Sequence, residues 1–394
     1  MRKLWRELRL LLALTAAFTL ACRPVHGLVA LNDGHDRIYV AGALSVSGDS
    51  NVYANSDERS DVLYSTSVTA DYTRRAGWIG VNASVAVSSA EFAELKEENY
   101  TNPSYSLEFT KQSGRTTGSL ILNAARESRA DAAVNLRSTS WNYGTGLNVK
   151  YPIVGMYTLS AQLGYNARDY VDKTVFANLE TYSASADLLR MLGSERDLML
   201  GYRYRFNDTS FNTSTTDHSF TVGLNGRLIR GLTGALRAGY QVRTFAGAAA
   251  GEDAFSSWTA SGSVSYAISK KMSLSAQISK DLSITATDSS VDVTSASISA
   301  RYAYSSRWSL SASGGWGYSR FLGDRGRVVV TLGPPLVLGP QRDDSFLSWN
   351  AGLGYSLNEH INFSAGYSWF KNWSALSYAD FVRTSWSASV SSRW

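Results

Sequence analysis

Apolar and polar side chains alternate almost without a break along the last fourteen residues of the chain. From Val382 to Trp394 the even-numbered positions are mostly apolar, whereas the odd-numbered positions from Arg383 to Arg393 hold only Arg and Ser. Successive side chains of a β-strand point to opposite faces, so one face of this segment suits hydrocarbon and the other suits water. The pattern predicts a strand over residues 381–394 that separates two different solvents.

The same alternation recurs in segments spread over the second half of the chain. Apolar residues occupy alternate positions in residues 198–206, 220–224, 236–242, 258–268 and 298–304. The intervening positions hold mainly Ser, Thr, Gly and Asn, with scattered Arg. A water-filled interior lined by small polar side chains would produce this second face.

Turn-forming residues recur at a spacing that fits strand pairs. Eight short turns are expected, at residues 74–77, 112–115, 151–156, 192–197, 229–232, 269–272, 305–308 and 358–361. Longer polar stretches lie between them, at residues 49–61, 91–102, 207–217, 245–253 and 281–292. Short turns alternating with long loops are typical of outer-membrane barrels. Eight turns and nine loops predict an all-β, transmembrane antiparallel β-barrel of about 18 strands, with both termini on the periplasmic side.

Composition agrees with a barrel and excludes other classes. No segment after the N-terminus approaches the length of a membrane-spanning helix, and mean hydropathy is only −0.17, so an integral protein of this composition has to be a barrel. The formal net charge is +5, but the first 27 residues carry +4 of it. The remainder is nearly neutral, so the basic isoelectric point does not indicate a nucleic-acid partner.

The N-terminus has the features of an export signal. Basic residues between Arg2 and Arg9 precede the apolar run Leu10–Leu20, which is too short to span a bilayer. Cleavage after Val25-His26-Gly27 predicts a signal peptide over residues 1–27 and a barrel over residues 28–394. The alternative is that Thr19-Leu20-Ala21-Cys22 acts as a lipobox and Cys22 is lipidated.

The C-terminal residue and the aromatic residues near strand ends support a membrane location. Trp394 at the end of the last strand resembles the C-terminal signal of bacterial outer-membrane barrels, which implies that it is an assembly signal read by the barrel insertion machinery. Aromatic residues near the short turns would form an interfacial girdle in the outer-membrane lipid. They are Trp78, Tyr151, Tyr266, Tyr304, Trp308, Tyr355 and Trp394.

The sequence offers little material for catalysis or metal binding. Cys22 is the only cysteine and there are four histidines, so we expect no disulfide, no metal site and no cofactor. Gly48-Asp49-Ser50 could mimic a lipase nucleophile segment, but no helical pattern follows it. Asp217-His218 could mimic the rim dyad of an outer-membrane protease, but no second acidic pair accompanies it. His35 and His360 are expected to be solvated, and we predict no enzymatic activity.

Residues 321–345 form the most unusual segment. It contains Pro334, Pro335 and Pro340, which are half of all prolines, around two short apolar runs. A loop of this length in a compact domain is often functional. Two interpretations remain open: an external hairpin that caps the barrel or contacts a partner, and a constriction loop that folds into the lumen.

The first loop carries a resemblance to known proteins. Asp49-Ser50-Asn51-Val52-Tyr53, followed by Ser60-Asp61-Val62, resembles the opening of the families of putative β-barrel porins. The resemblance extends over residues 28–394 in architecture but only over this opening in motif. It implies an association with exopolysaccharide export loci and with periplasmic polysaccharide export proteins, and it offers no catalytic residues.

Three functions follow from these observations. The first is an exit conduit for an exopolysaccharide, the second is a general diffusion porin, and the third is a non-transporting barrel that scaffolds a surface or electron-transfer complex. Arginines on the inferred lumen face would favour anions or an acidic polymer, unless they pair with loop carboxylates; few acids, such as Asp187, accompany them. These arginines are Arg168, Arg203, Arg205, Arg227, Arg237, Arg243, Arg301 and Arg383.

Overall fold

A computed structural model describes residues 29–32, 35–75, 77–131, 135–193, 195–247, 254–323, 327–330 and 337–394, with 327–330 and 337–341 described only as backbone. The predicted signal peptide at residues 1–27, and with it Cys22, lies outside the described residues. The described chain is almost entirely β-strand, with two short 3-10 turns at η2 (Lys96–Glu98) and η4 (Ser377–Ala379). No helix in this part of the chain is long and apolar enough to cross a membrane.

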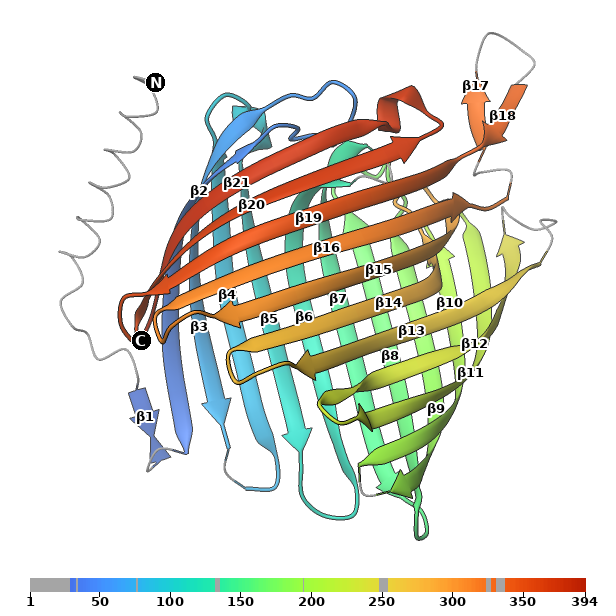
Figure 1. Ribbon diagram of the computed structural model, residues 1–394. Helices are drawn as coiled ribbons and strands as arrows, with labels where there is room; N and C mark the ends of the chain where they lie inside the picture. The colour runs from blue at the N-terminus through green and yellow to red at the C-terminus, as the bar shows by residue number, and fades with distance from the viewer. Residues whose placement is uncertain are drawn as a thin grey trace.

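Eighteen long strands form the wall (Figure 1). They are β2 (Asp36–Asp49), β3 (Asp61–Arg74), β4 (Gly80–Phe92), β5 (Tyr100–Lys111), β6 (Thr117–Asp131), β7 (Leu136–Pro152), β8 (Tyr157–Tyr170), β9 (Leu179–Gly193), β10 (Arg196–Thr209), β11 (Thr213–Ile229), β12 (Leu232–Gly247), β13 (Phe255–Ala267), β14 (Met272–Ile284), β15 (Ser290–Ala303), β16 (Trp308–Phe321), β19 (Asp343–Ser356), β20 (Ile361–Ser374) and β21 (Phe381–Arg393).

Hydrogen bonding closes this sheet on itself. Each wall strand pairs antiparallel with the next, and β21 pairs back with β2 from Ala41↔Arg393 to Asp49↔Ser385. The sheet has nineteen strands because the short β1 (Val29–Leu31) pairs with residues 36–38 of β2, outside the wall. The prediction of an antiparallel barrel of about 18 strands is confirmed.

The connections differ in length at the two ends of the barrel. All eight predicted short turns join wall strands at one end, which we call the turn end, and nine connections lie at the other, the loop end. Two of the predicted long loops are wrong in extent. Residues 207–217 are mostly strand, with only three residues between β10 and β11, and β14 and β15 extend into residues 281–292. Polar strand ends were mistaken there for loops.

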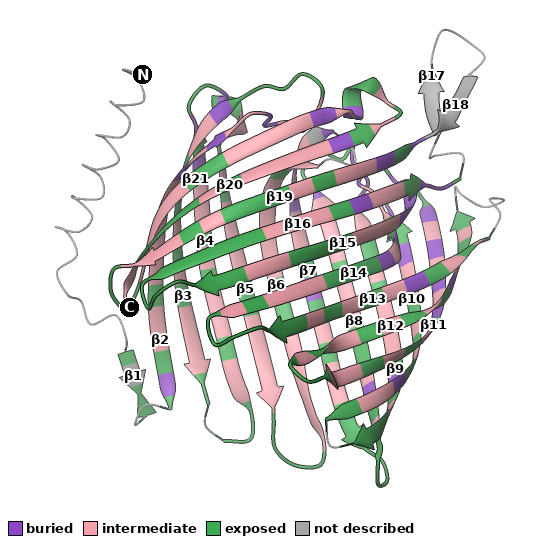
Figure 2. Ribbon diagram, viewed as in Figure 1, coloured by how far each residue is buried: buried purple, intermediate pink, exposed green. Residues whose placement is uncertain are grey.

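The two faces of the wall have the polarity that the alternation predicts. Large apolar side chains such as Leu200, Phe220 and Ile298 are more than half exposed on the outer face, as an apolar band in contact with lipid requires. The buried segments gather mainly toward the loop end (Figure 2). The core of this protein therefore lies inside the barrel mouth, where connecting segments meet.

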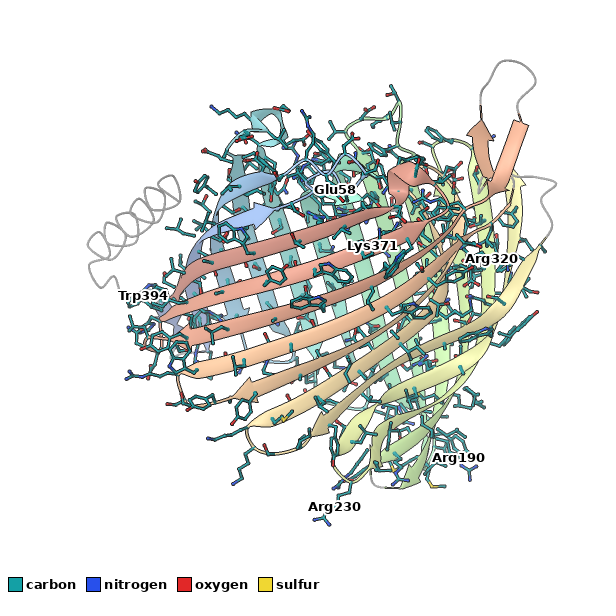
Figure 3. All side chains as sticks on the ribbon, turned by 45° about the horizontal axis from the view of Figure 1, so that its top comes forward. Glu58, Arg190, Arg230, Arg320, Lys371 and Trp394 are labelled. Carbon is teal, nitrogen blue, oxygen red and sulfur yellow. The ribbon has the colours of Figure 1, made fainter. Side chains whose placement is uncertain are left out.

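The terminal residue closes the wall at the turn end (Figure 3). Val40 and Trp394 exchange backbone hydrogen bonds of 3.0 and 2.9 Å. The Trp394 ring stacks on His360, with ring centroids 4.2 Å apart and planes 10° apart. The position of β1 covers the part of the β2 edge that β21 does not reach, which protects that edge from pairing with other chains.

We expect a Trp394→Ser variant to lose most of its folded protein, because it removes both the ring stack and the predicted assembly signal. Heat-modifiable electrophoretic migration of outer-membrane fractions would measure the folded fraction. A His360→Ala variant is the matched control, since it removes the stack but keeps the terminal aromatic residue. If both variants lose the same amount of folded protein, Trp394 acts through packing and not as a signal.

Candidate functional site: the constricted lumen

The loop-end part of β14 separates from β13, whereas β15 stays paired with β16 as far as Val291↔Phe321. Pairing of β13 with β14 stops at Ala260↔Lys280, whereas β14 and β15 stay paired as far as Ile284↔Ser290. The Arg205 guanidinium donates to the carbonyl oxygen of Leu282 at 2.7 Å, and Arg243 donates to that of Ser283 at 3.0 Å. Because β10 and β12 are not neighbours of β14, the free edge of β14 at residues 281–284 must turn inward, toward the inner faces of β10 and β12, while residues 291–293 remain paired with β16. We call residues 281–293 the inner hairpin.

Five charged side chains join the inner hairpin to the inner faces of β10, β11 and β12. Asp217 accepts hydrogen bonds from Arg243 at 2.6 and 2.8 Å and from Arg205 at 2.8 Å. Asp281 of the hairpin accepts from Arg203 at 2.7 Å and from Arg205 at 3.1 Å. The Arg243 and Asp217 side chains are 0% and 1% exposed, so their charges are stabilised by each other and by neighbouring protein groups instead of by water.

Strand register explains why these residues meet. Arg203 and Arg205 are two positions apart on β10 and therefore share the inner face. Arg205 lies opposite Asp217 of β11, and Asp217 lies opposite Arg243 of β12. Three neighbouring strands thus place a guanidinium, a carboxylate and a second guanidinium in one row across the wall.

An apolar contact fixes the tip of the inner hairpin. Ala286 is buried against Tyr170 and Phe176, whose rings stack with centroids 5.0 Å apart. The amide of Ala177 donates to the carbonyl oxygen of Ala286 at 2.8 Å. Leu282 and Val291 are also buried. The hairpin is therefore packed like a core element.

A second hairpin, formed by residues 126–140 of β6 and β7, separates from the neighbouring strand β5. Pairing of β5 with β6 stops at Ser104↔Ala125, next to Pro103, which has no N–H to donate. The Asn135 amide donates to the carbonyl oxygen of Ala54 at 2.8 Å and accepts from Arg342 at 3.2 Å. These bonds tie the second hairpin to the β2–β3 loop and to the segment before β19.

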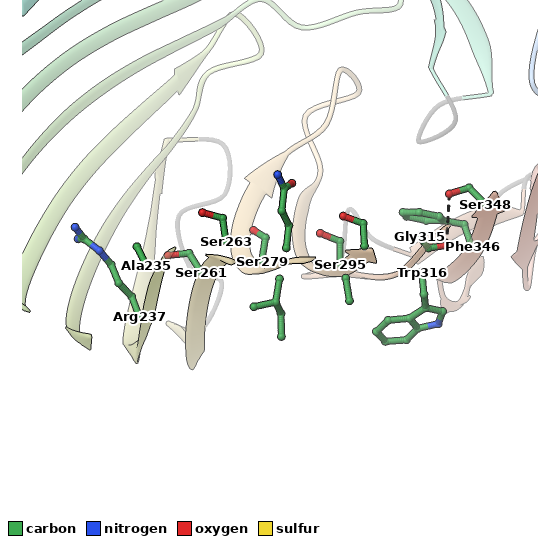
Figure 4. Close-up of a pocket in the computed structure, with 15 residues that line it drawn as sticks. Ala235, Arg237, Ser261, Ser263, Ser279, Ser295, Gly315, Trp316, Phe346 and Ser348 are labelled. Carbon is green, nitrogen blue, oxygen red and sulfur yellow. Dashed lines mark hydrogen bonds between the residues drawn. The ribbon is translucent and has the colours of Figure 1, made fainter. Parts of the chain in front are cut away.

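Three cavities follow one another along the inner wall. The uppermost, of about 360 Å³, lies between the two hairpins and the inner faces of β16, β19 and β20. The next, of about 480 Å³, is lined by six serines together with Arg237 and Phe346 (Figure 4). The third, of about 390 Å³, is lined by six further serines, Arg301 and Asn350. The described lumen is therefore narrow at the loop end and rich in hydroxyl groups below it.

The eight predicted lumen arginines fall into three groups according to their binding partners. Arg203, Arg205 and Arg243 bind the inner hairpin, as described above. Others pair elsewhere: Arg237 with Asp187 at 2.8 Å, Arg383 with Asp49 at 2.5 Å and Arg227 with Glu195 at 2.7 Å. Arg168 and Arg301 have no carboxylate within ion-pair distance among the described residues.

One expectation about charge is wrong. The inner face was expected to carry few carboxylates, but Asp49, Asp217 and Asp281 join Asp187 there, and each binds at least one arginine. The structure gives a further reason to set aside an Asp217-His218 dyad, because consecutive strand residues point to opposite faces. His218 lies outside, with its Nδ1 2.8 Å from the Tyr202 hydroxyl. The register between strands places Asp217 opposite two arginines. The sequence pattern of a single strand does not contain this information.

Part of the predicted constriction loop lies outside the described residues. Pro334 and Pro335 lie outside the described residues, and Pro340 belongs to β18 (Val337–Gln341), which pairs with β17 (Arg327–Val330) in a separate two-stranded sheet. Among the described residues, the segments that narrow the lumen are instead the two hairpins. A role for residues 321–345 stays a prediction. The groups of His, Cys, Asp and Glu in the described chain include none arranged to hold a metal ion.

A closed antiparallel barrel of eighteen strands, apolar outside and polar inside, with a lumen narrowed by inward-folded segments, is the architecture of an outer-membrane β-barrel channel. Sequence comparison agrees. The family described as "Outer membrane protein beta-barrel domain" matches residues 231–393, and the family described as "Putative beta-barrel porin 2" matches residues 125–304. No curated protein matches the chain.

Solved structures share the fold at low sequence identity. OpdK from Pseudomonas aeruginosa, determined with vanillate, is 13% identical, and the match covers 91% of this chain and 99% of that one with a TM-score of 0.50. OccK2 (OpdF) from the same organism, in complex with glucuronate, is 12% identical, with 91% and 97% coverage and a TM-score of 0.50. At these identities the likeness concerns the fold alone.

Proposed function

We propose that this outer-membrane channel is the exit conduit for an exopolysaccharide. The observation that carries the proposal is the hydroxyl-lined wall below the constriction, where twelve serines line two successive cavities. Serine hydroxyls donate and accept hydrogen bonds. A sugar chain can therefore exchange one partner for the next as it moves, without a deep binding minimum.

Charge pairing along the wall supports the same proposal. Asp217 and Asp281 offset two of the three positive charges of Arg203, Arg205 and Arg243. A wall whose charges alternate and are largely offset builds a weaker field of one sign than the arginines alone would. It suits a neutral or weakly charged polymer better than the strongly anion-selective passage that the arginines alone would indicate.

Loss of the channel is expected to trap polymer inside the cell envelope. In a strain that lacks this chain, total carbohydrate should accumulate in the periplasmic fraction and decrease on the cell surface. Full-length chain restored from a plasmid is the control. An unchanged amount of surface carbohydrate in the deletion strain would contradict the export function and favour a diffusion channel.

A channel for small organic acids is the second candidate. Two solved barrels with the same fold were determined with vanillate and with glucuronate. Arg168 and Arg301, which lack carboxylate partners among the described residues, could attract such acids. Liposome swelling with glucuronate and with neutral sugars of similar size separates the two candidates.

The orientation of the barrel follows from the proposal, with the turn end and both termini in the periplasm and the loop end outside. An epitope tag inserted at Asn212, in the exposed β10–β11 connection, should be accessible to antibody on intact cells. A tag at Lys270, in the turn between β13 and β14, should become accessible only after the membrane is permeabilised. Labelling of the Lys270 tag on intact cells would reverse the orientation.

A further inference from the structure

An aromatic ring lies flat on the inner wall at the junction of two cavities. Phe346 of β19 is paired with Gly317 of β16. A Cβ atom added to Gly317 would lie 2.2 Å from Cε1 of the Phe346 ring and 2.3 Å from its Cζ. The ring therefore occupies the space directly over the glycine backbone, which only a residue without a side chain leaves free. Its other face is turned to the lumen.

Two further phenyl rings extend this surface around the wall. Phe370 of β20 stacks on Phe346 with centroids 5.5 Å apart and planes 26° apart, and Phe381 of β21 follows at 5.6 Å and 29°. Phe381 is buried, whereas Phe346 and Phe370 are only partly buried. We call Phe346 and Phe370 the phenyl platform. Aromatic rings in such stacked arrangements hold one another in place.

The phenyl platform lies where a polymer passing through the lumen would contact it. Phe346 lines both the uppermost cavity and the serine-lined cavity below it, and in Figure 4 its ring lies on the lumen side of the strand whereas Trp316 points to the other side. Phe370 lines the uppermost cavity as well. A polymer that moves between these two cavities crosses the platform.

Polar groups of both signs face the platform across the uppermost cavity. Arg129 and Asp131 come from the second hairpin and Arg168 from β8. The Arg168 guanidinium donates to Oδ1 of Asn142 at 2.7 Å and to the Tyr170 hydroxyl at 3.5 Å. Arg129 lies 3.4 Å from Glu127, and both side chains are about half exposed. The cavity thus offers donors and acceptors opposite an apolar surface.

This combination fits a sugar ring. A pyranose has apolar C–H faces and a rim of hydroxyl groups that both donate and accept hydrogen bonds. A flat aromatic surface accommodates the C–H face, and guanidinium and carboxylate groups opposite it bind the hydroxyls. The cavity volume of about 360 Å³ lies at the small end of the range for ligand pockets, about 300–1,000 Å³. It has room for a short stretch of a glycan chain.

We propose that the phenyl platform, with Arg129, Asp131 and Arg168 opposite it, is a saccharide-binding subsite at the constriction. This inference rests on the proposed function and names the contact by which the channel recognises its polymer. Phe346 and Phe370 contact the sugar faces. Gly317 is a positioning residue, since it lets the Phe346 ring lie flat.

Blockade of ion current by sugar tests the subsite in the purified full-length chain. The probes are maltohexaose and cellohexaose added to single channels in planar bilayers, with polyethylene glycol of equal hydrodynamic radius as a control for simple exclusion. We expect at least one hexasaccharide to cause resolved closures in the parent protein. In a Phe346→Leu variant, which keeps apolar volume but loses the flat face, the dissociation constant should rise about tenfold, and Phe346→Tyr should retain parental binding.

Matched variants separate the subsite from general effects on the barrel. Leu347→Ala changes the neighbouring residue on the outer face and should leave the block unchanged, whereas Phe370→Leu should weaken it. The inference is overturned if neither hexasaccharide blocks the parent more than polyethylene glycol does. It is equally overturned if Phe346→Leu and Phe370→Leu bind as the parent does. The carbohydrate assay on the deletion strain is independent, so the subsite and the export function can fail separately.

Discussion

An Asp217→Ala variant should have a free energy of unfolding lower than that of the parent by about 3–5 kcal/mol, the usual cost of removing one partner of a buried ion pair. Asp217 is the only carboxylate that binds Arg243 among the described residues, and the Arg243 side chain is 0% exposed. Without Asp217, Arg243 keeps only the Ser283 carbonyl oxygen and the Ser290 hydroxyl as partners. Reversible urea unfolding in detergent or lipid measures the difference.

A carboxylate on the neighbouring strand gives the matched control. Asp208 of β10 accepts a hydrogen bond from the Ser214 hydroxyl at 2.7 Å, but this contact is exposed. Asp208→Ala should therefore change the free energy of unfolding by no more than about 0.5 kcal/mol, as is usual for surface substitutions. Equal effects of the two substitutions would show that the buried ion pairs do not stabilise the barrel.

Removing the tip of the inner hairpin should cause a large increase in single-channel conductance. Leu282 lies opposite Asp292 in the hairpin register, so residues 283–291 can be replaced by Asn-Gly, a pair that forms a two-residue hairpin turn. The shortened hairpin no longer reaches Tyr170 and Phe176, and the mouth widens by the space that it occupied. Planar-bilayer recording measures the conductance.

A single substitution tests the same contact without shortening the chain. Ala286→Asp places a carboxylate against the Tyr170 and Phe176 rings, where burial of an unpaired charge is unfavourable. We expect brief transitions to the conductance of the shortened variant. If the shortened variant conducts like the parent, the inner hairpin does not limit the passage.

The strand count and the eight turns could be predicted because their signals are local. Alternation with period two is visible within one strand, and turn residues separate one strand from the next. The inner hairpin could not be predicted in this way. Residues 281–292 are polar enough to resemble a loop, and their inward course depends on where pairing with β13 stops. The apolar residues Leu282, Ala286 and Val291 within that polar stretch were the available sign of burial.

The binding partners of the lumen arginines also could not be predicted from patterns within single strands. Their alternation with apolar residues placed them on a face opposite the outer surface, but their partners are set by register between strands. Arg205, Asp217 and Arg243 are far apart in sequence and meet only when three strands are aligned. The ring of Phe346 is a further example, because its flat position depends on a glycine in another strand.

The seam between β2 and β21 has a mechanical consequence. Neighbouring wall strands are joined elsewhere by a connecting segment of the chain, but these two are held together only by noncovalent contacts, which are hydrogen bonds and the ion pair of Arg383 with Asp49. Nine residue pairs span the seam, together with the exchange between Val40 and Trp394 and the hydrogen bond from the Ser50 amide to the Thr384 carbonyl oxygen. Under lateral tension in the membrane, the wall would part along this line first, since no covalent link limits the separation of its two edges.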